Sequence, residues 1–119
     1  MQIKEYQELA SRTCNDLGSE ATNNIHMLFG MVTEVAEAVD AYKKAWAYGR
    51  DLDLTNVKEE IGDLLFYVVN FARFNNFDLE EVMKTNIEKL KVRYPEAYSN
   101  EKAINRDLET ERKILEDAN

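Results

Sequence analysis

The sequence has few of the residues that interrupt helices or cross-link a chain. Its 119 residues include one cysteine, one proline and four glycines. A single cysteine excludes an intrachain disulfide and a thiolate zinc cluster. So few glycines and prolines favour long helices joined by short turns. The longest apolar run, residues 61–69, contains Gly62 and Asp63 and falls far short of the ~20 residues of a membrane span, so we expect no membrane segment.

Positive charge is also scarce. Fifteen lysines and arginines stand against 23 aspartates and glutamates, which gives a net charge of −8. Because a negative field repels a polyanion, we expect no binding to a nucleic acid polymer, although a bound cation would still admit a small anionic ligand. The amino terminus, Met1 to Glu5, has no apolar core of a signal peptide, and we expect a cytoplasmic protein.

Apolar residues recur every three or four positions over most of the chain, which is the spacing of helices that bury one face. Caps and breakers then predict the helix ends. In chain order we predict helices over residues 3–14; over 22–48, ended by Gly49; from the N-cap Thr55 to about Asn75 and Asn76; from the N-cap Asp78, with Glu81 completing a capping box, to before Pro95; and once more within the charge-dense residues 99–119.

The predicted fold is all-α, an antiparallel bundle of four to five helices. The helix over residues 22–48 carries an apolar stripe that we expect to face the core, namely Leu28, Met31, Val32, Val35, Val39, Tyr42 and Trp46. A chain of this length buries one small core, so we expect oligomerisation to complete the bundle. We divide the chain into a domain over residues 1–98 and a charged helical tail over 99–119, packed on that domain or on a neighbouring subunit.

Two predicted helices each carry a pair of carboxylates three residues apart, Glu34 with Glu37 and Glu60 with Asp63. This spacing places the two acids of a pair on one helix face. Surface acids commonly have a lysine or arginine three or four residues away, but none of these four does. Clustered carboxylates repel one another unless a cation lies among them. The pattern therefore predicts a metal site, with solvated surface acids as the alternative.

Ligand chemistry narrows the choice of metal. Oxygen ligands alone select a hard ion, Mg²⁺ or else Mn²⁺. A di-iron helical bundle would need Glu-x-x-His pairs, and the single histidine, His26, lies in none. Because the coordination shell of Mg²⁺ held by carboxylates is often completed by substrate phosphates, such a site would also need phosphate-binding groups. Asn86, Lys89 and Arg93 share one face of the fourth predicted helix, although plain surface charge explains them equally well.

The order of these motifs resembles the MazG-like family of all-α nucleoside triphosphate pyrophosphohydrolases. The motifs are Glu34-x-x-Glu37, a gap of 22 residues, Glu60-x-x-Asp63, and then Asn86-x-x-Lys89-x-x-x-Arg93-Tyr94-Pro95. The resemblance implies a Mg²⁺-dependent hydrolase that cleaves a ribo- or deoxynucleoside triphosphate to a monophosphate and pyrophosphate and acts in nucleotide-pool house-cleaning. It also implies a homodimer or homotetramer.

The resemblance further implies roles for individual residues. Glu34, Glu37, Glu60 and Asp63 would be the metal ligands and catalytic carboxylates, with Glu37 the first candidate to activate the attacking water. The substrate-binding set would be Asn86, Lys89 and Arg93 on the triphosphate, Tyr67 on a phosphate and His26 near the base. For Tyr67 and His26, packing within the helices is an alternative. For the whole chain, the alternative is a non-catalytic acidic helical interaction module. Base and sugar preference, the number of metal ions and the choice between dimer and tetramer stay open.

Overall fold

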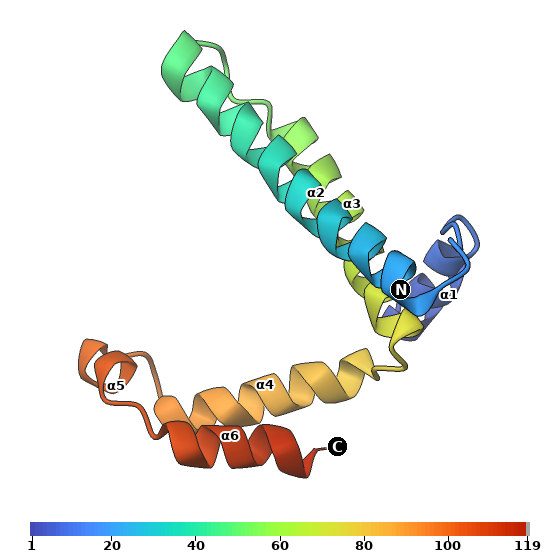
Figure 1. Cartoon of the computed structure of the whole chain (residues 1–119). Coiled ribbons are helices and arrows are strands. Elements are labelled where there is room, and N and C mark those ends of the chain that lie inside the picture. Colours follow the sequence, from blue (N-terminus) through green and yellow to red (C-terminus); the bar gives the residue numbers. More distant parts are fainter. Residues whose placement is uncertain (119) are drawn as a thin grey trace. The chain divides into compact units, whose positions relative to one another are not determined.

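The computed structural model describes residues 1–118, and every regular element in them is a helix (Figure 1). The all-α prediction is confirmed. The helices are α1 (Ile3–Ser11), α2 (Glu20–Tyr48), α3 (Leu54–Phe74), α4 (Leu79–Arg93), α5 (Asn100–Ile104) and α6 (Leu108–Asp117). Internal contacts group them into two compact units, one of residues 1–77 and one that starts at Asp78. Across the described residues, no helix combines the length and apolar character that crossing a membrane requires.

In the first unit, α2 and α3 pack side by side as a helical hairpin, and α1 packs on α3 (Figure 1). The hairpin follows from its caps. Ser19 accepts a hydrogen bond from the Thr22 amide at the start of α2, and Gly49 ends α2 in the left-handed conformation at φ 64°. The side chain of Asp53 accepts from the Asn56 amide and caps α3, so the predicted N-cap at Thr55 was wrong by two residues. A stronger capping side chain lay just upstream.

The core inside the first unit is small. Its buried apolar residues are Ala10, Met27, Ala41, Val69 and Ala72. Six of the seven residues in the predicted α2 stripe, all but Met31, are exposed within the single chain, and Trp46, expected in the core, is 90% exposed. The stripe exists at the predicted spacing, but α3 covers it only in part, because Val35, Val39 and Tyr42 line an open groove between α2 and α3. An apolar face left exposed in this way is typical of a surface that another chain covers.

In the second unit, α6 packs on α4. Asp78 caps α4 as predicted, and the helix ends at Arg93, before Pro95. The prediction of one helix after residue 98 was wrong, because the segment forms α5 and α6 with a break at residues 105–107. Asp107 ends the break by accepting a hydrogen bond from the Thr110 amide, which starts α6. The division into a 1–98 domain and a tail stays a prediction.

Candidate metal centre

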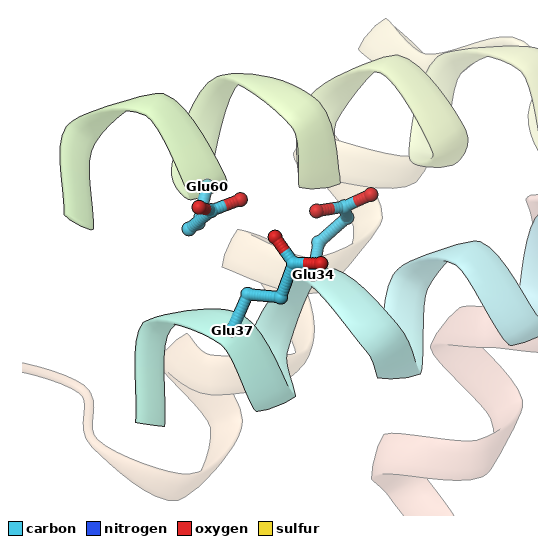
Figure 2. A group of neighbouring side chains, drawn as sticks. All are labelled: Glu34, Glu37 and Glu60. Atoms are coloured by element: carbon cyan, nitrogen blue, oxygen red, sulfur yellow. The ribbon is translucent and has the colours of Figure 1, made fainter. Parts of the chain in front are cut away.

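Three carboxylates converge between α2 and α3. Glu34 and Glu37 come from α2 and Glu60 from α3, and one carboxylate oxygen of each lies within 4.8 Å of the others (Figure 2). The i, i+3 spacing places Glu34 and Glu37 on the face of α2 that borders α3, and the hairpin brings Glu60 opposite them. The two acids three residues apart on α2 thus lie beside a third carboxylate, which comes from α3.

Glu60 is the buried member of the group, at 4% exposure. Its Oε1 accepts a hydrogen bond of 2.6 Å from Nδ2 of Asn56, one turn earlier on α3. The sequence interpretation missed Asn56, although its i−4 spacing from Glu60 could have indicated it. Within residues 1–118, no lysine or arginine forms an ion pair with Glu34, Glu37 or Glu60. Within the described residues, the side-chain hydrogen bond to Glu60 thus comes from an uncharged amide, which does not neutralise the carboxylate.

The electrostatics of the group reflect this uncompensated charge. The pKa of Glu34 is raised, first by burial and then by its contact with the Glu60 carboxyl and the charge of Glu37. The pKa of Glu37 is raised first by the charge of Glu60 and then by burial. Both shifts mean that the three carboxylates are hard to ionise together in the absence of a cation. A divalent ion would remove that repulsion.

The donor set fits a hard divalent cation. Three carboxylates from two packed helices supply oxygen ligands only, which matches the preference of Mg²⁺ and Mn²⁺ and not that of zinc or copper. Glu34 and Glu37 are partly or fully exposed, so the side of the group away from Glu60 is open to solvent and to a ligand. An ion held there would keep coordination positions for water or phosphate.

Asp63, the fourth predicted ligand, lies one turn beyond Glu60 on α3 and is exposed. The group within 4.8 Å consists of the three glutamates, and Asp63 is outside it. The charge of Asp63 nevertheless contributes to the raised pKa values of Glu34 and Glu37. Asp63 therefore belongs to the electrostatic neighbourhood of the centre, and its role as a ligand stays a prediction.

Tyr67 of α3 and His26 of α2 contact each other across the helical hairpin. Their rings pack edge to face with centroids 6.1 Å apart, and a Cβ at Gly30 would overlap the Tyr67 ring. Gly30 thus lets the tyrosine lie directly on α2. Burial, followed by the charges of Glu34 and Asp63, raises the pKa of Tyr67, which keeps its hydroxyl protonated. The Nδ1 atom of His26 is buried with no hydrogen-bond partner among the described residues. Both residues have a packing role, and their predicted contacts with substrate stay predictions.

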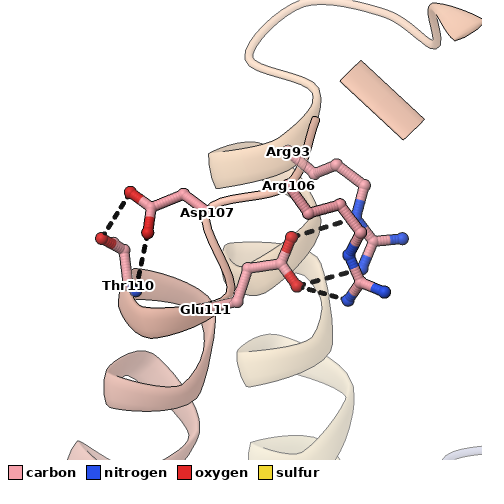
Figure 3. A network of polar contacts seen from close by, with 5 residues as sticks. All are labelled: Arg93, Arg106, Asp107, Thr110 and Glu111. Carbon is pink, nitrogen blue, oxygen red and sulfur yellow. Dashed lines mark hydrogen bonds and ion pairs between the residues drawn. The ribbon is translucent and has the colours of Figure 1, made fainter. Parts of the chain in front are cut away.

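The predicted triphosphate-binding residues all lie on α4, in the second unit. Asn86 is exposed and Lys89 is partly exposed. The guanidinium of Arg93 donates two hydrogen bonds to Glu111 of α6, and Arg106 donates a third (Figure 3). The sequence interpretation missed this network, because Arg93 and Glu111 are 18 residues apart and no helical spacing connects them.

Fold and site together define a class: helical proteins with a cluster of carboxylates between two packed helices. A comparison with protein families then gives the particular family. The model of the MazG nucleotide pyrophosphohydrolase domain matches residues 20–98, which is most of the chain, so the chain belongs to the MazG family. The predicted resemblance is confirmed. No curated protein and no solved structure matches the chain significantly. Membership points to a nucleotide pyrophosphohydrolase and thus to a hydrolase.

Proposed function

We propose that this protein hydrolyses nucleoside triphosphates to the monophosphate and pyrophosphate with Mg²⁺, as part of nucleotide-pool house-cleaning in the cytoplasm. The observation that carries the proposal is the group of Glu34, Glu37 and Glu60, which gathers three carboxylates without a cationic partner in the described chain, inside a domain of the MazG family. Triphosphate and metal complement each other here, because the acidic centre would repel a triphosphate that arrived without a cation.

In this mechanism Glu34, Glu37 and Glu60 would hold the ion, and Asp63 would be a further ligand. When bound, the ion supplies positive charge that offsets the negative charge developing on the phosphate oxygens. Glu37 is the exposed member of the group, so its carboxylate is accessible to orient and deprotonate the water that attacks the α-phosphorus. Pyrophosphate is the leaving group.

The remaining predicted residues bind substrate. Lys89 and Arg93 supply positive charge and Asn86 supplies an amide for the triphosphate, and these three share one face of α4. The Tyr67 hydroxyl, held protonated near Glu34 and Asp63, can donate a hydrogen bond to a phosphate oxygen. His26 lies against Tyr67 and is proposed to border the nucleoside.

A second copy of the chain is proposed to cover the apolar face of α2. Val32, Val39 and Trp46 are more than half exposed there, and Glu34 and Glu60 border an apolar groove of about 380 Å³ between α2 and α3. A homodimer or homotetramer would bury this face. Light scattering of the purified protein should give a mass of two or four chains, and Val32→Glu should reduce it. A monomer at micromolar concentration would contradict this part.

The function is tested by measuring pyrophosphate release across ribo- and deoxynucleoside triphosphates with Mg²⁺. We expect turnover of one or more triphosphates and a loss of about 100-fold or more in kcat for Glu37→Gln and Asp63→Asn. The matched control is Asp40→Asn, since Asp40 is on the same helix but forms ion pairs with Lys43 and Lys44. This variant should keep full activity.

Three results would count against the proposal. Release of orthophosphate instead of pyrophosphate would refute attack at the α-phosphorus. Unchanged turnover in both Glu37→Gln and Asp63→Asn would remove the site assignment. If no triphosphate is hydrolysed and Mg²⁺ has no effect on thermal unfolding, the non-catalytic acidic interaction module becomes the better interpretation.

A further inference from the structure

Glu111 on α6 is a buried carboxylate in the part of the chain that the family match does not reach. It is 3% exposed and accepts three hydrogen bonds, from Nε and Nη2 of Arg93 at 3.0 Å each and from Nη2 of Arg106 at 2.6 Å (Figure 3). The family match ends at residue 98. The contact therefore connects Arg93, which is proposed to bind phosphate, to a residue outside the matched domain.

The ion pair is better suited to fix a geometry than to stabilise the fold. A buried ion pair gains little stability over an apolar pair of the same shape, because both charges lose their hydration. What it does supply is a defined arrangement, since a carboxylate bound by two parallel N–H groups holds the guanidinium plane in place. The position of Glu111 is itself set by the cap at Asp107, which accepts from the amide and hydroxyl of Thr110.

The contact uses only one edge of the Arg93 guanidinium. An arginine carries five N–H donors in a planar fork, and Glu111 takes the Nε and Nη2 side. Tyr94 also lies beside this guanidinium, with its ring centroid 5.7 Å from Cζ of Arg93. The Nη1 and Nη2 edge is the one that Glu111 leaves for two oxygens of one phosphate. The Arg93 side chain is 16% exposed and that of Arg106 is 37% exposed, so neither is sealed from solvent. Two guanidinium groups on one carboxylate leave a net positive charge, which still attracts an anion.

We propose that Glu111 is a positioning residue for Arg93, holding one edge of its guanidinium so that the other edge meets the triphosphate. The proposal rests on the proposed function, in which Arg93 binds phosphate. It adds that α6, beyond the matched family domain, contributes to substrate affinity through this contact. The opposite arrangement, in which Glu111 masks Arg93, makes the opposite prediction for affinity.

The experiment compares the wild-type protein with Glu111→Gln, which keeps the shape of the side chain and removes its charge. The control is Glu116→Gln on the same helix, where an exposed glutamate loses its 2.7 Å ion pair with Arg112. KM and kcat are measured for the best triphosphate, and calorimetry measures binding of inorganic tripolyphosphate with Mg²⁺. Circular dichroism checks that each variant folds, and Glu111→Asp, which keeps the charge, replaces Glu111→Gln if that variant does not.

We expect Glu111→Gln to raise KM and the tripolyphosphate dissociation constant about tenfold, with kcat changed less, because a charge-assisted contact that orients the phosphate ligand is weakened. Glu116→Gln should match the wild type. In an Arg93→Lys background, where the bidentate fork is absent, Glu111→Gln should change KM less than twofold. A merely structural role would lower stability without this dependence on Arg93.

Unchanged KM and tripolyphosphate affinity in a folded Glu111→Gln variant would overturn the positioning role, and tighter binding would replace it with masking. Equal KM effects in the wild-type and Arg93→Lys backgrounds would also overturn it. These failures are distinct from failure of the proposed function, which shows as a wild-type protein that releases no pyrophosphate. In that event tripolyphosphate binding alone still decides whether Glu111 acts through Arg93.

Discussion

Glu60 on α3 and Glu111 on α6 are almost equally buried, at 4% and 3% exposure, but their surroundings are opposite in charge. Glu60 faces the carboxylates of Glu34 and Glu37 and receives one hydrogen bond from the Asn56 amide. Glu111 faces two guanidinium groups. In the first unit the neighbours of Glu60 have raised pKa values, whereas in the second unit the pKa of Glu111 itself is lowered to about 2.

The difference separates two uses of a buried acid. The carboxyl group of Glu111 is compensated by two arginines of the chain, so its charge needs no added cation. The carboxyl group of Glu60 is not compensated within the described chain, and the fold holds it against repulsion from its neighbours. Carboxylates gathered without a cationic partner repel one another, and a bound cation would remove that repulsion. The comparison therefore predicts that a divalent ion stabilises one region and leaves the other unchanged.

The largest expected effect is the response of thermal unfolding to Mg²⁺. At a concentration 100 times the dissociation constant, binding to the folded state alone adds about 2.7 kcal/mol to the free energy of unfolding. Glu60→Gln should lose most of this gain, and without Mg²⁺ its midpoint of unfolding should be higher than that of the wild type. Glu111→Gln should keep the full Mg²⁺ response, and its midpoint should be lower with and without the ion. Equal Mg²⁺ responses in the two variants would contradict the predicted difference between Glu60 and Glu111.

A smaller effect concerns the packing that holds the carboxylates together. Gly30→Ala places a Cβ where the ring of Tyr67 lies, so the ring must move and α2 and α3 must separate locally. We expect a loss of about 2 kcal/mol in the free energy of unfolding, measured in urea, as for other overpacked contacts. Weaker Mg²⁺ binding should accompany this loss, because Glu34 is one turn from Gly30 on α2.

The matched control is Gly62→Ala, since Gly62 is also inside a helix of the same hairpin but has no neighbour within 4 Å of an added Cβ. Alanine should stabilise α3 there by roughly 0.5–1 kcal/mol through helix propensity alone. If both alanine variants change stability in the same direction, the close approach of Tyr67 to Gly30 does not hold the hairpin together.

The carboxylate centre was predictable from sequence because its signal is local. Pairs of acids three residues apart, without a cation along the same helix, predict a shared face, and hairpin pairing then brings Glu60 to Glu34 and Glu37. Helix ends were predictable where one capping residue dominates, as at Gly49 and Asp78. They were misplaced where two candidates compete, as Asp53 and Thr55 do at the start of α3.

The features that the sequence could not predict are the contacts between helix faces that are far apart in the chain or that belong to different chains. The spacing of Val32, Val39 and Trp46 marks an apolar face but does not say whether α3 or another chain covers it, and within this chain it is exposed. The pairing of Arg93 with Glu111 depends on how α6 returns along α4, and that path is set by the break between Asn105 and Asp107. Composition showed only a charge-dense tail.

The smallest expected effect is the dependence of stability on pH. Its sign should be opposite for Glu111 and for the pair Glu34 and Glu37. Hydrogen bonds from Arg93 and then Arg106 lower the pKa of Glu111 from 4.5 to about 2, so its contribution to stability is complete above pH 4.5 and is lost as the pH falls toward 2. Glu34 and Glu37, with raised pKa values, take up protons above pH 4.5, and in metal-free protein this uptake favours the folded state.

Midpoints of thermal unfolding, measured without Mg²⁺ from pH 7 to pH 2, test both signs. The difference between the wild type and Glu111→Gln should stay constant down to about pH 4.5 and then shrink, because protonated Glu111 and glutamine both lack the charge that the two arginines bind. Glu37→Gln should instead differ most from the wild type at neutral pH, where it relieves repulsion from Glu60. A difference for Glu111→Gln that persists unchanged to pH 2 would mean that the arginines do not stabilise the charge of this carboxylate, and Glu111 would then have no electrostatic hold on Arg93.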